Sequence, residues 1–239
     1  MRETIANLRQ QLREDIGRIH VVDNNSAARL AGARLAEVAE HSPAFIALLA
    51  EPWLGTSMTV RTRQLLSACA RIHLYARILD DAIDEDLMVC RHNLIRAQPL
   101  FWEAVQNIGA AVSVQVAAEA TSLIAETISA VQTDDLHPDP NCWAAKNHHL
   151  LLIPLLLSGN SSAYQACRPG LSSMIALVQA GDEWKQGALE SRALRASLLE
   201  VLTRCLDSKQ LTALQQHGWH AASERIIWNA QKLIDALSA

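Results

Sequence analysis

The sequence contains few glycines and lacks the alternation of β-branched and polar residues that marks strands. Glycine accounts for 9 of its 239 residues. The residues that dominate instead are Ala, Leu, Gln, Glu and Arg, which favour helices. Half of the residues are hydrophobic and 19% are charged, so the chain has ample material for a buried core. These features predict an all-α protein.

The sequence also lacks a basic stripe and a cysteine motif. Its net charge is −4, which argues against non-specific binding to nucleic acid. Its five cysteines are scattered, odd in number and without C-x-x-C spacing. This pattern is typical of reduced thiols in a cytosolic protein, rather than of disulfides or a zinc site.

No long apolar segment is present. Residues 1–20 are charged throughout and contain no apolar core of a secretory signal. The longest apolar run, Leu150 to Leu157, includes Pro154 and is too short to cross a bilayer. We therefore expect a cytoplasmic protein without a transmembrane segment.

Apolar periodicity and helix-breaking residues predict the element boundaries. Without an internal repeat or a low-complexity linker, they indicate one all-α domain over residues 1–239. A proline-bearing loop is expected over 133–141 and a helix break at 168–170. The helices are expected at about 2–19, 26–40, 43–49, 58–85, 88–107, 109–131, 142–158, 170–190, 193–206, 209–217 and 220–238.

An aspartate-rich run, Asp80-Asp81-x-x-Asp84, ends the helix expected over 58–85. On a helix, Asp80 and Asp84 share a face and Asp81 lies beside them. Crowded carboxylates repel one another by about a few tenths of a kcal/mol per pair, and a cation relieves that repulsion. Mg²⁺ prefers carboxylate oxygens and is often shared with substrate phosphates. The run therefore predicts a platform for a metal-bound diphosphate, with a solvated acidic helix end as the alternative.

A second polar group, Asp182, Gln186 and Glu190, is spaced by four residues. A continuing helix would align these side chains on one stripe, which could complete an Mg²⁺ site facing the first motif. The same spacing is found on the wet side of any amphipathic helix.

The order of these two motifs resembles that of class I terpenoid synthases, including polyprenyl diphosphate synthases. The residues before the first motif, Ile72-His73-Leu-Tyr-Ala-Arg77, are similar to those that precede the aspartate-rich motif of that superfamily. Lys146, followed by Leu150-Leu151, looks like its lysine-containing helix. The resemblance covers about residues 58–190, and only its first motif is specific.

The resemblance implies a single helical bundle around a central apolar pocket with the acidic motifs at its mouth. It implies an allylic prenyl diphosphate as substrate and Mg²⁺ as cofactor, with dimerisation expected only by analogy. It implies catalytic metal binding by Asp80, Asp81 and Asp84, and further metal binding by Asp182, Gln186 and Glu190. Donors to the diphosphate would be Lys146 together with one of Arg61, Arg63 or Arg77.

The sequence departs from the elongating members of the superfamily. It lacks the Arg-Arg-Gly that usually follows the first motif, and its second motif has the spacing of a terpene cyclase triad with glutamine in the middle. A terpene synthase that rearranges or cyclises a carbocation is therefore preferred. The alternatives are a prenyltransferase, to which the short chain is also suited because it resembles moenomycin-type enzymes in size, and a non-catalytic partner subunit.

Several residues also have simpler interpretations. Arg77 precedes Asp81 by four residues and could form only an intrahelical ion pair. Lys146 could be a surface lysine. His73 lies on an apolar helix and is expected to be a hydrogen-bonded core histidine. Asp134 is expected in a solvated turn.

Overall fold

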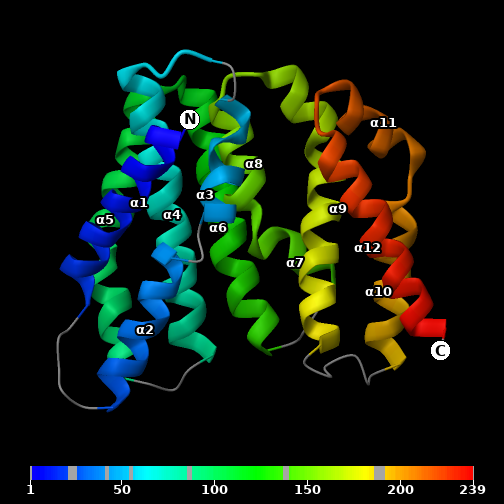
Figure 1. The fold of residues 1–239 in the computed structure, drawn as a ribbon, viewed down its shortest axis with the longest axis horizontal. Helices are drawn as coiled ribbons and strands as arrows, with labels where there is room; N and C mark the ends of the chain where they lie inside the picture. The colour runs from blue at the N-terminus through cyan, green and yellow to red at the C-terminus, as the bar shows by residue number, and fades with distance from the viewer. Residues whose placement is uncertain are drawn as a thin grey trace. The chain divides into compact units, whose positions relative to one another are not determined.

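The computed structural model describes residues 2–20, 26–40, 43–53, 56–84, 88–136, 140–185 and 192–238. Over these ranges the chain is helical without strands, which confirms the predicted all-α class (Figure 1). A 3-10 turn, η1, covers Glu51–Trp53. The α-helices are α1 (Arg2–Ile19), α2 (Ser26–Glu40), α3 (Pro43–Ala50), α4 (Val60–Asp84), α5 (Met88–Ala111), α6 (Val114–Leu136), α7 (Pro140–Lys146), α8 (His148–Leu157), α9 (Ser161–Lys185), α10 (Arg192–Cys205), α11 (Ser208–Gln216) and α12 (His220–Ser238).

Most helices lie where the apolar periodicity predicts them. In α1, Leu8 and Leu12 are four residues apart and only 5% and 0% exposed, so the predicted stripe faces the core. α2 covers the expected range, and α4 begins two residues later and ends one residue earlier than predicted. No helix in the described part of the chain is both long and apolar enough to cross a membrane.

Three predicted boundaries are wrong. The loop expected over 133–141 is shorter, because α6 continues to Leu136 and α7 begins at Pro140. The helix expected over 142–158 is interrupted at Asn147, whose backbone N–H donates to the carbonyl of Ala144 at 3.1 Å, as in a turn. The break expected at 168–170 is absent, because α9 continues through Pro169. A proline inside a helix costs about 3 kcal/mol, so tertiary packing of α9 must outweigh that local signal.

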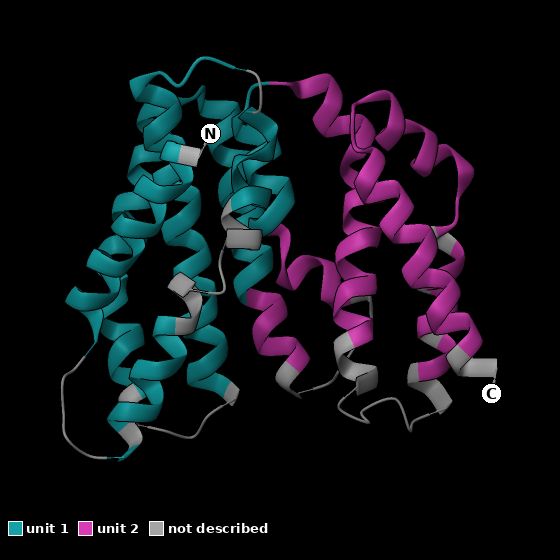
Figure 2. Ribbon diagram, in the orientation of Figure 1, with its two compact units in different colours: residues 1–128, 149–159 teal, residues 129–148, 160–239 magenta. Residues whose placement is uncertain are grey.

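The chain divides into two compact units, and each is built from two chain segments (Figure 2). The first unit comprises residues 1–128 and 149–159. Within it, α4 contacts α1, α2, α3 and α5. The largest fully buried side chains of α4 are Leu66, Leu74 and Ile78, so this helix forms the centre of the first core.

The second unit comprises residues 129–148 and 160–239. Here α9 is central, because α7, α10, α11 and α12 all contact it. Trp143 of α7 is 0% exposed and Tyr164 of α9 is 1% exposed, which places large aromatic side chains in this second core.

Candidate functional site

Asp80 and Asp81 lie near the end of the central helix of the first unit. Both carboxylates are buried, with only 9% and 7% of each residue exposed. α4 continues without interruption to Asp84, so the three aspartates of the motif do lie on one helix. The side chain of Asp84 is outside the described residues, and its predicted role as a ligand stays a prediction.

Arg77 pairs with both described aspartates. Its Nη1 lies 2.8 Å from Oδ2 of Asp80, and its Nη2 lies 3.4 Å from Oδ1 of Asp81. The intrahelical ion pair expected as an alternative is therefore confirmed. The side chain of Arg77 is 46% exposed, and a guanidinium has more N–H donors than these two contacts use.

Two residues that the sequence analysis missed also lie beside Asp81. Arg34 of α2 places its Nη1 3.6 Å from Oδ1 of Asp81. Asn93 of α5 is 2% exposed, and its Oδ1 has no hydrogen-bond partner among the described residues. Neither has a motif of its own, and only the packing of α2 and α5 against α4 brings them to the aspartate.

Asp81 and Asn93 line a small cavity of about 10 Å³. Its other lining residues, Ala31, Leu35, Ile78 and Cys90, are all buried. This volume is enough for about one water molecule and far too small for a prenyl chain. The predicted apolar substrate pocket is therefore not this cavity, and it stays a prediction.

One turn before Arg77, His73 is buried within the core of the first unit. Its Nδ1 lies 3.2 Å from Nε2 of His149, and the two rings stack with centroids 5.3 Å apart. Burial, reinforced by the positive charge of Arg77, lowers the pKa of His73 to about 4. The expected hydrogen-bonded core histidine is confirmed, and its ring is neutral at physiological pH.

The structure separates Arg61 and Arg63 from the aspartates. Both are exposed residues in the first turn of α4, whereas Asp80 lies near its last turn. At about 1.5 Å per residue, at least about 25 Å of helix lies between them. These two arginines therefore lie far along the helix from Asp80 and Asp81. Their predicted role as donors to the diphosphate stays a prediction.

Lys146 has a carboxylate partner inside the second unit. Its Nζ lies 3.1 Å from Oδ2 of Asp134, whose Oδ1 accepts a hydrogen bond of 3.0 Å from Nε1 of Trp143. Asp134 is 8% exposed and belongs to α6, so its predicted place in a solvated turn is wrong. The diphosphate role of Lys146 stays a prediction.

The second predicted motif lies at the end of α9. That helix includes Asp182 and ends at Lys185. Gln186, Glu190 and the side chain of Asp182 are outside the described residues, so their alignment as metal ligands stays a prediction. Among the side chains that are described, no three of His, Cys, Asp or Glu are placed to hold a metal ion together.

No protein family, curated protein or solved structure that was compared with this chain matches it. The all-α class is shown directly by the structure. The resemblance to class I terpenoid synthases rests on the motifs alone.

Proposed function

We propose that the chain is an Mg²⁺-dependent terpene synthase that ionises an allylic prenyl diphosphate and rearranges or cyclises the resulting carbocation. The observation that carries this proposal is the placement of Asp80 and Asp81. These adjacent buried carboxylates lie near the end of an apolar central helix that continues to Asp84. Crowded carboxylates in a core require positive partners, and a metal ion that is bound together with a diphosphate can supply that positive charge.

The donor set fits Mg²⁺, because carboxylate oxygens are the ligands that this ion prefers. When bound, the ion would supply Lewis-acid stabilisation of the departing diphosphate. In the structure, Arg77 and Arg34 provide the positive charge around Asp81. The aspartates would therefore exchange at least part of their guanidinium contacts when they bind a cation.

When the aspartates bind a cation, Arg77 and Arg34 become available to contact the diphosphate. The side chain of Arg77 is 46% exposed and that of Arg34 is 35% exposed, and both lie beside the aspartates. Their forked donors suit phosphate oxygens. We propose that they bind and orient the diphosphate, holding the C–O bond that breaks next to the aspartate end of α4.

Two alternatives are kept. A prenyltransferase would use the same ionisation and then attach the prenyl cation to isopentenyl diphosphate or to another acceptor. A non-catalytic partner subunit is favoured by one specific observation: the ion pairs of Asp80 and Asp81 already neutralise the carboxylates, as a purely structural group would.

The test is incubation of the purified protein with Mg²⁺ and C10, C15 or C20 prenyl diphosphate, each with and without isopentenyl diphosphate. Pyrophosphate and organic products are both measured. A hydrocarbon or alcohol from one diphosphate supports the terpene synthase. A longer diphosphate that requires isopentenyl diphosphate supports the elongating transferase instead.

The matched variants are Asp80→Asn with Asp81→Asn, compared with Asp235→Asn on the exposed surface of α12. Asparagine preserves shape, so helicity should persist while Mg²⁺-dependent turnover falls by at least about 10²-fold. Turnover that is equal in the double variant and the wild type would refute the assignment of the aspartates. Absence of turnover with every substrate, together with a large loss of stability in the double variant, would favour the structural role.

A further inference from the structure

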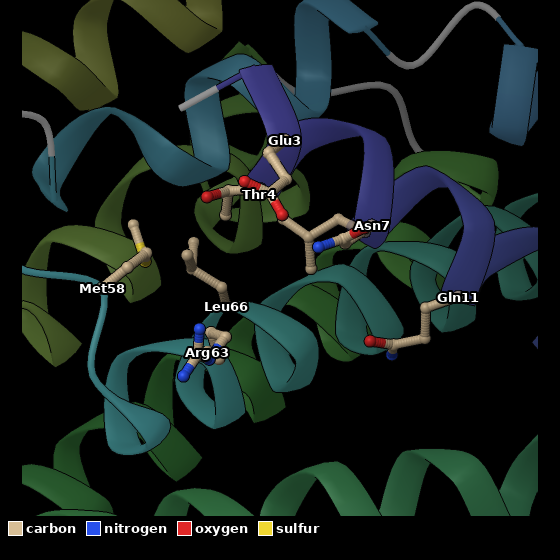
Figure 3. Close-up of a pocket in the computed structure, with 8 residues that line it drawn as sticks. Glu3, Thr4, Asn7, Gln11, Met58, Arg63 and Leu66 are labelled. Atoms are coloured by element: carbon tan, nitrogen blue, oxygen red, sulfur yellow. The ribbon is translucent and has the colours of Figure 1, made fainter.

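A second pocket lies in the first unit, between α1 and the segment that begins α4 (Figure 3). Its volume is about 330 Å³. This is at the lower end of the range for small-molecule sites, which is about 300–1,000 Å³. Since one water molecule takes up about 30 Å³ in the liquid, the pocket has room for roughly ten non-hydrogen atoms.

The two walls of the pocket differ in chemistry. α1 contributes Glu3, Asn7 and Gln11, which are spaced by four residues and so form one polar stripe. The other wall is more apolar, with Met58 and Leu66, and Leu66 is 0% exposed. Arg63 also belongs to this second wall, so a ligand that fills the space meets polar side chains on both walls and apolar side chains toward the base of α4 (Figure 3).

One positive and one negative side chain line the pocket. Figure 3 shows Arg63 of α4 across from Glu3 of α1. Within the described part of the chain, neither forms an ion pair. Glu3 would repel a ligand that carries only a negative charge, and Arg63 would repel one that carries only a positive charge. A ligand that carries both charges can pair with both side chains.

We propose that this pocket binds a small zwitterion, specifically an α-amino acid with an apolar side chain of medium size. Arg63 binds the carboxylate through its forked donors, and Glu3 accepts hydrogen bonds from the ammonium group. Asn7 and Gln11 add amide contacts, and Leu66 with Met58 contacts the apolar side chain. The site is independent of the proposed function, because at least about 25 Å of α4 separates Arg63 from Asp80.

The proposal is tested by isothermal titration calorimetry of the full chain with L-leucine, L-methionine and L-phenylalanine. Two analogues of leucine each remove one charge: 4-methylpentanoate lacks the amine, and 3-methylbutylamine lacks the carboxylate. We expect at least one of the amino acids to bind, and both analogues of leucine to bind at least about tenfold more weakly than leucine itself.

Variants identify the site. Arg63→Gln and Glu3→Gln should each weaken binding of the amino acid by at least about tenfold. Arg61→Gln is the matched control, because Arg61 is an exposed arginine two residues away that does not line the pocket. Both test side chains are exposed, so circular dichroism should show unchanged helicity.

Three results would overturn the proposal. The first is no binding of any of the three amino acids at about 10 mM, which corresponds to a site too weak to be specific. The second is equal affinity for leucine and its singly charged analogues. The third is unchanged affinity in both Arg63→Gln and Glu3→Gln, which would place binding elsewhere on the chain.

Discussion

At the scale of single residues, charge pairing decides what the candidate site can do. The carboxylates of the aspartate motif should repel one another unless positive charges lie beside them. In the structure, Asp80 and Asp81 contact Arg77 of their own helix, and Asp81 also contacts Arg34 of α2. The intrahelical partner follows from spacing in the sequence, whereas Arg34 reaches Asp81 only because α2 packs against α4.

The buried histidine His73 should make the free energy of unfolding sensitive to acid. Burial, with a smaller effect of Arg77, lowers its pKa from 6.5 to about 4. Between these values the unfolded chain binds a proton that the folded chain excludes, so stability falls as the pH falls. The contribution of neutral His73 is complete above about pH 6.5 and is lost toward pH 4, with a total near about 3 kcal/mol.

Urea denaturation between about pH 7 and pH 4.5 measures this effect. His73→Gln should show a smaller loss of stability on acidification than the wild type. His92→Gln, at an exposed position on α5, should behave like the wild type. His148, whose pKa burial and then Arg168 also lower to about 4, should preserve part of the acid sensitivity in the His73 variant. Identical slopes for His73→Gln and the wild type would contradict the prediction.

At the scale of elements, one charged network joins three helices. Arg71 of α4 donates to Asp15 of α1 through Nε at 2.9 Å and Nη2 at 3.3 Å, and its Nη1 lies 2.8 Å from Glu103 of α5. Burial by itself lowers the pKa of Arg71, but hydrogen bonds and attraction from both carboxylates outweigh it and raise that pKa overall. The network therefore holds a charged guanidinium in a largely buried place.

The two carboxylates of this network should differ in importance. The side chain of Asp15 is 2% exposed and that of Glu103 is 52% exposed. Asp15→Ala leaves Arg71 buried with only the exposed partner, so we expect a loss of about 3 kcal/mol in the free energy of unfolding. Glu103→Ala breaks a pair at the surface and should cost less than about 1 kcal/mol. Urea denaturation of both variants checks the order, and equal losses would contradict it.

Helix α9 shows why a local break signal fails. Pro169 and Gly170 predict the end of a helix, yet the helix continues to Lys185. A Cβ at Gly170 would lie 2.8 Å from Cδ1 of the fully buried Leu214. The glycine is thus explained by the close approach of α11, which the sequence alone does not reveal.

Two glycines of α9 should respond oppositely to replacement by alanine. Gly170→Ala crowds Leu214 and should destabilise the protein by about 1–3 kcal/mol. A Cβ at Gly181 meets no atom within 4 Å, so Gly181→Ala should stabilise the helix by about 0.5–1 kcal/mol. Thermal unfolding followed by circular dichroism compares them. Stabilisation by both substitutions would show that α9 and α11 are not in close contact at Gly170.

At the scale of the whole molecule, each unit needs two separate parts of the sequence. The first unit receives α8 from a later segment, and nearly all of that helix is buried, including Leu151, Leu152 and Ile153 at 0–1% exposure. Each fully buried side chain of this kind contributes about 1.5–3 kcal/mol. Their sum is comparable with the entire stability of a domain, about 5–15 kcal/mol.

A fragment of residues 1–128 should therefore not fold cooperatively, whereas a fragment of residues 1–159 contains the whole first unit and should. Urea denaturation followed by circular dichroism separates the two. We expect a sigmoidal transition only for the longer fragment. A cooperative transition of equal midpoint in the shorter fragment would show that α8 is dispensable for the first core.

The sequence by itself determined the all-α class, most helix ranges and the placement of the aspartate motif on one helix. These follow from apolar periodicity and helix propensity, which act between residues a few positions apart. Only the tertiary structure decided the partners of the buried charges, among them Arg34 beside Asp81 and Trp143 beside Asp134. It also decided the separation of Arg63 from Asp80. Such contacts depend on which helices pack together, since the partners can be far apart in the sequence. A buried charge is costly without a partner, but the sequence does not show which residue that partner is.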